Sequence, residues 1–96
     1  MLILRVVQPA SVARNGLVGR FGNSGGTVGR APDCTLALPD PQKHVSRVQA
    51  ELRCAGNIWV VVNRSEVTPM SVNGAALAPG ALVPAMGAAV VAAAVH

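Results

Sequence analysis

Proline and glycine residues interrupt this chain so often that a long helix has no room to form. Ten glycines and seven prolines are spread over 96 residues, and one of them breaks nearly every window of helical length. Proline lacks the N–H group that the interior of a helix requires, and glycine loses much conformational freedom there. The segments between these breaks are short and apolar. This pattern predicts an all-β domain, a sandwich of about ten short strands.

The apolar residues favour the same architecture. Hydrophobic residues make up 51% of the chain, but they include only one Trp, one Phe and no Tyr. The core is therefore expected to be built mostly from small and β-branched side chains such as Val, which suit a sheet better than a helical bundle. A chain of this length supports one modest core. Residues 1–96 are predicted to form a single domain.

The clearest strand pattern occupies residues 48–54, where apolar and polar residues alternate. The face expected to be buried consists of Val48, Ala50, Leu52 and Cys54. Residues 58–62 are continuously apolar, which predicts a strand buried on both faces and joined to the first by a hairpin at residues 55–57. The dipeptide Asn73-Gly74 between apolar residues predicts a second, tight hairpin. Further short strands are expected at residues 2–7, 18–21, 27–30, 34–38, 82–83 and 88–95.

The net charge of +4 does not indicate a nucleic-acid partner. Lys43 is the only lysine, and the other cations are seven scattered arginines. Proteins that bind nucleic acid usually have a dense face of Lys and Arg, and those that bind single strands also have aromatic residues that stack on the bases. We therefore expect no nucleic-acid binding.

Cysteine usage and hydropathy predict a cytoplasmic, soluble domain. Cys34 and Cys54 are the only cysteines and form no Cys-x-x-Cys motif. Reduced, buried thiols are the favoured interpretation, with a disulfide as the alternative. Arg5 interrupts the first apolar segment, so no secretory leader is expected. The apolar run at residues 88–95 is far shorter than the roughly 18 residues of a membrane span, so no membrane insertion is expected either.

One loop region gathers cations and a hydroxyl group. Arg30 ends the strand predicted at residues 27–30. The loop after the strand predicted at residues 34–38 contains Lys43, His44, Ser46 and Arg47. Guanidinium groups match phosphate oxygens bidentately, and a serine hydroxyl donates one more hydrogen bond. This combination suits a phosphate-like anion. It is the candidate functional site.

The chain contains three short motifs: Gly29-Arg30, residues 46–49 (Ser-Arg-Val-Gln) and Asn73-Gly74. In these motifs, and in its predicted all-β character and its length, it resembles the forkhead-associated (FHA) domains. Residues 25–33, 38–41 and 44–47 are most similar to FHA domains of bacterial type VI secretion proteins. The resemblance implies a β-sandwich of about eleven short strands whose loops at one end bind a phosphothreonine in a partner protein or peptide. It also implies a role in a bacterial signalling or type VI secretion assembly. Arg30, Ser46 and Arg47 would then contact the phosphate.

Two positions depart from the family pattern. The family has a histidine that braces the loop where this chain has Gln49, which can also donate and accept hydrogen bonds. The family also has an Asn-Gly-Thr motif in the next loop, and its asparagine bonds the peptide backbone; Thr68 is the matching residue here. Lys43, His44 and Arg64 are candidates for contacts that select the peptide sequence.

These departures leave a second function open. A degenerate FHA domain would dock a protein partner independently of phosphorylation. An enzyme is not expected, because the chain has no Ser-His-Asp set and no paired carboxylates. His44 and His96 lack a third ligand, so neither a metal nor another cofactor is expected.

Overall fold

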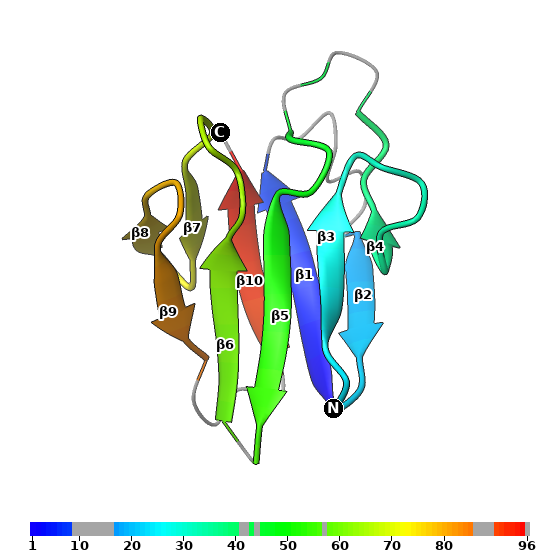
Figure 1. Cartoon of the computed structure of the whole chain (residues 1–96), viewed down its shortest axis with the longest axis vertical. Helices are drawn as coiled ribbons and strands as arrows, with labels where there is room; N and C mark the ends of the chain where they lie inside the picture. Colours follow the sequence, from blue (N-terminus) through cyan, green and yellow to red (C-terminus); the bar gives the residue numbers. More distant parts are fainter. Residues whose placement is uncertain (9–16, 41–42, 44, 57, 86–89, 96) are drawn as a thin grey trace.

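The protein is a sandwich of two five-stranded β-sheets (Figure 1). The computed structural model describes residues 1–8, 17–40, 43, 45–56, 58–85 and 90–95. The ten strands within these ranges are β1 (Leu2–Gln8), β2 (Val18–Phe21), β3 (Gly26–Gly29), β4 (Leu36–Ala37), β5 (Ala50–Ala55), β6 (Ile58–Asn63), β7 (Met70–Val72), β8 (Ala75–Leu77), β9 (Leu82–Pro84) and β10 (Val90–Val95). The predicted all-β sandwich is confirmed. In the same ranges no helix is long and apolar enough to span a membrane.

The sheet order places both ends of the chain in one sheet. That sheet runs β2-β1-β10-β7-β8, and the other runs β4-β3-β5-β6-β9. β1 and β10 pair in parallel, with Ile3 opposite Val90 and Val6 opposite Ala93. β3 and β4 also pair in parallel. The middle of the second sheet, β3-β5-β6, is antiparallel, and its strands carry the loops discussed below.

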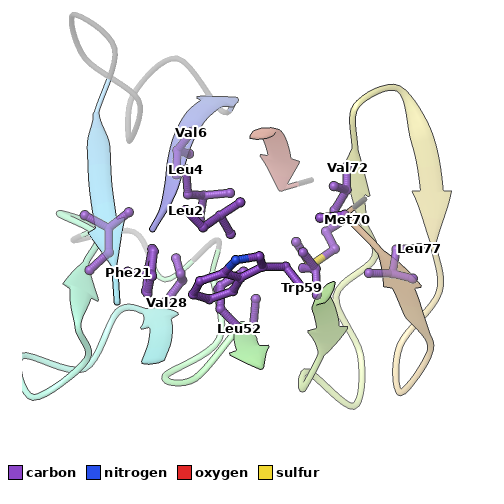
Figure 2. Packing of buried hydrophobic residues seen from close by; sticks show 14 of the residues in the cluster. Leu2, Leu4, Val6, Phe21, Val28, Leu52, Trp59, Met70, Val72 and Leu77 are labelled. Atoms are coloured by element: carbon purple, nitrogen blue, oxygen red, sulfur yellow. The ribbon is translucent and has the colours of Figure 1, made fainter. Parts of the chain in front are cut away.

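The core lies between the two sheets (Figure 2). Leu2, Leu4 and Val6 alternate along β1 and are at most 2% exposed. Trp59 of β6 lies near the middle of the cluster, with Met70 of the opposite sheet close by. Trp59 is 7% exposed and belongs to this core.

The tight hairpin predicted at Asn73-Gly74 is confirmed. These two residues join β7 to β8 directly, with Val72 opposite Ala75. Their φ angles of 50° and 81° are both positive, as a two-residue type I′ turn requires. Asparagine and glycine are the residues that adopt this conformation most readily. This hairpin is therefore encoded locally.

The predicted bounds of two strands were wrong. β4 contains two residues instead of the five expected at 34–38, and β5 begins at Ala50 instead of Val48. Val48 was expected to be buried but is 39% exposed. The reason is that the carbonyl groups of Ser46 and Arg47 accept hydrogen bonds from residues 30 and 31. This segment therefore belongs to a loop until the ladder with β6 begins.

The prediction that residues 58–62 are buried on both faces was also wrong. Ile58 is 52% exposed and Val60 is only half-buried, whereas Trp59 and Val61 face the core. The opposite sheet covers one face of β6, and on the other face Val62 is buried, at 7% exposed, whereas Ile58 and Val60 are not. The apolar residues on the outer face give β6 its continuous apolar run.

Both cysteines are free thiols, as the favoured interpretation predicted, but the expected burial holds for Cys34 and was wrong for Cys54. Cys34 is buried in the turn before β4, and its Sγ donates to the carbonyl of Arg47 at 3.4 Å. Cys54 is half-buried on β5. Cys34 therefore adds a contact between the two segments that form the candidate site.

Candidate functional site

Arg30 lies immediately after β3, at the end of the sandwich drawn uppermost in Figure 1. Its backbone N–H donates to the carbonyl of Ser46 at 3.1 Å, and its Nε donates to the carbonyl of Val45 at 3.1 Å. The next N–H, of Ala31, donates to the carbonyl of Arg47 at 3.0 Å. Within the described residues, the two terminal nitrogens of Arg30 make no hydrogen bond. Among these residues, the guanidinium is therefore held through Nε alone.

Gly29 explains how closely the two segments approach. A Cβ atom at position 29 would lie 2.2 Å from the carbonyl oxygen of Arg47 and 2.9 Å from the backbone nitrogen of Gln49. Contacts that short do not occur with real side chains, so the backbone would have to move. A glycine before Arg30 is thus required by packing. It lets the strand end lie directly against the loop that carries Ser46.

Ser46 is connected to a third segment, the loop of residues 64–69 between β6 and β7. Its Oγ lies 2.7 Å from the Oγ of Ser65, which is 19 positions away in the sequence. The backbone N–H of Ser46 donates to Oε1 of Gln49 at 3.1 Å. The Ser46 side chain is half-buried. Three segments are therefore joined around this one serine.

Gln49 and Asn63 form a buried network of amide groups beneath these loops. Both side chains are 0% exposed. Nε2 of Gln49 donates to Oδ1 of Asn63 at 3.0 Å and to the carbonyl of Thr68 at 3.1 Å. Nδ2 of Asn63 donates to the carbonyls of Thr68 and Leu77, at 3.0 and 3.1 Å. The prediction that Gln49 braces the loop in place of a histidine is confirmed.

Thr68 is held in the site by its backbone. Its N–H donates to Oγ of Ser65 at 2.8 Å, and its carbonyl accepts the two amide bonds described above. The described hydrogen bonds leave the Thr68 hydroxyl unused, and the side chain is half-buried. The structure therefore brings Thr68 into the loop group that contains Ser46.

The loop of residues 38–49 is stabilised from inside by Asp40. Its carboxylate is 6% exposed, and Oδ2 accepts a hydrogen bond from the backbone N–H of Val45. Lys43 has a positive φ of 58° and an exposed side chain. His44 lies outside the described residues. Asp40 thus positions the Val45 carbonyl that holds Arg30.

The two remaining predicted cations are placed differently. Arg47 contributes its carbonyl to the contacts with Ala31 and Cys34, and its side chain is exposed. Arg64 is also exposed, and its Nε lies 3.5 Å from Oε1 of Glu51. The guanidinium of Arg64 is therefore paired with a carboxylate on β5.

Glu51 also accepts a hydrogen bond from Nη2 of Arg53 at 3.0 Å. This bond, together with the charges of Arg53 and Arg64, holds the pKa of Glu51 below its usual value, although partial desolvation acts in the opposite direction. A depressed folded-state pKa stabilises the fold above the unfolded-state pKa. The contribution is lost as the pH falls through the folded-state value.

We therefore expect Glu51→Gln to lower the free energy of unfolding slightly near pH 7 and less near pH 3. The loss should stay below about 1 kcal/mol, because these charges are largely solvated. Denaturant titrations of both proteins at the two pH values test this. Glu66→Gln is the matched control, since Glu66 forms no ion pair with the described residues. An equal loss at both pH values would contradict the assigned role of Glu51.

An open pocket of about 500 Å³ lies next to this loop group. Its lining comes from the end of β6, the following loop and the turn before β9, namely Val62, Asn63, Arg64, Ser65, Glu66, Pro79 and Gly80. The pocket shares Ser65 with the Ser46 contact. A ligand held over the loops therefore has a recess beside it.

Sequence reasoning identified Arg30, Ser46 and Gln49 but missed Ser65 and the role of Asp40. Ser65 carried a usable signal, because a serine often accepts hydrogen bonds from N–H groups two and three positions later. That is the arrangement observed with Val67 and Thr68. The Ser46–Ser65 contact itself had no local signal.

Two packed sheets with polar groups gathered on three loops at one end define an all-β binding domain. The family model of the FHA domain matches residues 26–84, and the chain belongs to this family. FHA domains are protein-interaction modules that bind phosphothreonine, not enzymes.

A solved structure supports the fold assignment. The chain is similar to the FHA domain of FhaA, in a crystal structure of that domain complexed with the intracellular domain of Rv3910. The TM-score is 0.58 and the sequence identity 21%, over 73% of this chain and 71% of that chain. A comparison with curated proteins gives no match.

Proposed function

We propose that this domain binds a phosphothreonine in a partner protein or peptide, with Arg30 and Ser46 as the main phosphate contacts. The observation that carries the proposal is the anchoring of Arg30. Its Nε is held by the Val45 carbonyl, and its backbone is bonded to Ser46, so its outer nitrogens stand next to the segment that bears a hydroxyl group. A phosphothreonine brings about −1.5 to −2 charges and three strong acceptor oxygens.

The remaining residues have subsidiary roles in this proposal. The exposed guanidinium of Arg47 adds a second positive charge, and the Thr68 hydroxyl offers one hydrogen bond to the peptide. Lys43, His44 and Arg64 are proposed to contact side chains flanking the phosphothreonine. For Arg64 this contact competes with the ion pair to Glu51. Its share in binding is therefore expected to be small.

We also propose that residues 1–96 act as one FHA domain in the cytoplasm, within a bacterial signalling or type VI secretion assembly. The pairing of β1 with β10 and of β10 with β7 supports the extent of the domain, because strands outside residues 26–84 complete the first sheet. The free thiols are compatible with a reducing compartment. The likeness of the loop sequences to FHA domains of type VI secretion proteins supports the assembly.

The experiment that tests phosphate recognition is a degenerate peptide array with a central phosphothreonine, read beside its dephosphorylated copy. Binding that requires the phosphate and shows a residue preference supports the proposal. Equal binding to both copies would instead support the alternative, a degenerate FHA domain that docks its partner without phosphate. Val67, which is 80% exposed in the loop of residues 64–69, offers an apolar contact for such docking.

Replacing Thr68 by the asparagine of the family pattern should strengthen phosphopeptide binding. An asparagine side chain can bond two backbone groups of the peptide, and each neutral bond contributes about 0.5–1.5 kcal/mol. We expect Thr68→Asn to raise the affinity about tenfold. The loop should tolerate the change, because the contacts of Thr68 use its backbone.

Calorimetric titration with a peptide selected from the array measures this effect. Thr68→Val is the control, since it keeps the side-chain shape and removes the hydroxyl. It should bind no more tightly than the unmodified domain. An unchanged or lower affinity of a folded Thr68→Asn protein would show that the peptide backbone does not pass over this position.

A further inference from the structure

The hydroxyl pair of Ser46 and Ser65 has a defined proton direction. Ser65 is 3% exposed, and its Oγ accepts hydrogen bonds from the N–H groups of Val67 at 3.2 Å and Thr68 at 2.8 Å. A serine oxygen has two acceptor lone pairs and one O–H donor. The two backbone groups therefore occupy both lone pairs. At 2.7 Å from Ser46, the Ser65 hydroxyl must be the donor of that bond.

The same count of donors and acceptors determines which hydrogen bonds the Ser46 hydroxyl group can make. The Oγ of Ser46 accepts the hydrogen bond from Ser65, so its own O–H is not used in that bond, and it makes no other hydrogen bond with the residues that the structure describes. Its backbone cannot turn easily, because the N–H is bonded to Gln49 and the carbonyl accepts from Arg30. The O–H of Ser46 is thus presented by a residue fixed on both sides.

We propose that Ser65 is a positioning residue for anion binding. Ser65 accepts hydrogen bonds from the N–H groups of Val67 and Thr68 and donates its own O–H to Ser46, which directs the O–H of Ser46 away from Ser65. This inference rests on the proposed function, and it assigns Ser65 a part in the recognition of the phosphate group. Without Ser65, the Ser46 hydroxyl can rotate and must be oriented by the ligand itself. Hydrogen bonds in such a chain also polarise one another, so the last donor is strengthened.

A double-mutant cycle separates this role from a merely structural one. The proteins are the unmodified domain, Ser46→Ala, Ser65→Ala and the double variant. The probe is N-acetyl-O-phosphothreonine N-methylamide, titrated into ¹⁵N-labelled protein and followed by NMR. We expect Ser65→Ala to weaken binding about threefold to tenfold. In the Ser46→Ala background the same change should have a clearly smaller effect, because the part of its effect that passes through Ser46 is already lost.

A conservative variant guards against loss of the loop structure. Ser65→Thr keeps the hydroxyl group and should retain the affinity for the probe within about threefold. In Ser65→Ala, the amide chemical shifts of Val67 and Thr68 report the loss of the two hydrogen bonds that their N–H groups donate to Ser65. If Ser65→Ala weakens binding equally with and without Ser46, or leaves a folded protein with unchanged affinity, the positioning role is overturned.

A different result would contradict the proposed function itself. If the unmodified domain does not bind the probe, or if Arg30→Ala binds it equally well, both the phosphate site and the positioning role of Ser65 are wrong. Normal binding that depends on Arg30, together with an additive cycle, overturns the role of Ser65 alone.

Discussion

Arg30→Ala should reduce the affinity for a phosphothreonine peptide by about a hundredfold or more. Two charge-assisted bonds from the terminal nitrogens of Arg30 to the phosphate are worth about 1.5–3 kcal/mol each, and about 1.4 kcal/mol corresponds to one decade in affinity. The fold should be little affected, because Arg30 is half-buried and its side chain makes one hydrogen bond with the described residues, to the carbonyl of Val45. Calorimetric titration with a peptide selected from the array gives the result.

The matched control is Arg20→Ala, which removes the same charge elsewhere. Arg20 is exposed on β2 and lies opposite Ile3, near the N-terminus, away from the loops that surround Arg30 (Figure 1). It should change the affinity only through the net charge, by less than about threefold at physiological salt. Arg30→Lys should fall between the two, because it keeps the charge and loses the planar fork. Affinity of Arg30→Ala equal to that of Arg20→Ala would refute the assignment of the phosphate site.

Asn63→Ala should destabilise the fold more than any surface substitution. The Asn63 side chain is fully buried and takes part in four hydrogen bonds, with Gln49, Ser65, Thr68 and Leu77. Each buried partner left unsatisfied costs about 1–3 kcal/mol. We expect a loss of about 3–5 kcal/mol in the free energy of unfolding, a large part of the roughly 5–15 kcal/mol typical of small domains.

Thermal and denaturant unfolding measure this loss, and Tm should fall by about 15 °C or more. Asn23→Ala is the control, because Asn23 is exposed in the turn between β2 and β3. It should change stability by less than about 0.5 kcal/mol. Equal, small losses in both variants would mean that the network beneath the loops contributes nothing to stability.

Several elements of the fold were predictable from local patterns. The alternation of residues 48–54 predicted a strand that the structure has at Ala50–Ala55, and the dipeptide Asn73-Gly74 predicted the correct hairpin. Side-chain period and turn chemistry act over a few residues, so both signals are local. The exposure of Val48 and Ile58 was not predicted. Both depend on which neighbouring segment covers each face, and that information is not local.

The candidate site divides in the same way. Arg30 and Ser46 were identified from residue type and family resemblance, and the brace by Gln49 followed from its ability to donate and accept. Their roles toward phosphate stay predictions until binding is measured. The buried carboxylate of Asp40 and the Ser46–Ser65 contact came only from the structure.

The order of residues determined the all-β character of this protein, its turns, and the donor groups available on its loops. Tertiary packing decided which of those groups meet: Arg30 reaches Val45 across 15 positions, and Ser46 reaches Ser65 across 19. The physical reason is the distance along the chain over which each interaction acts. Backbone preference and turn formation involve neighbours along the chain, whereas the positions of loops at the end of a sandwich depend on how the sheets that carry them pair and pack.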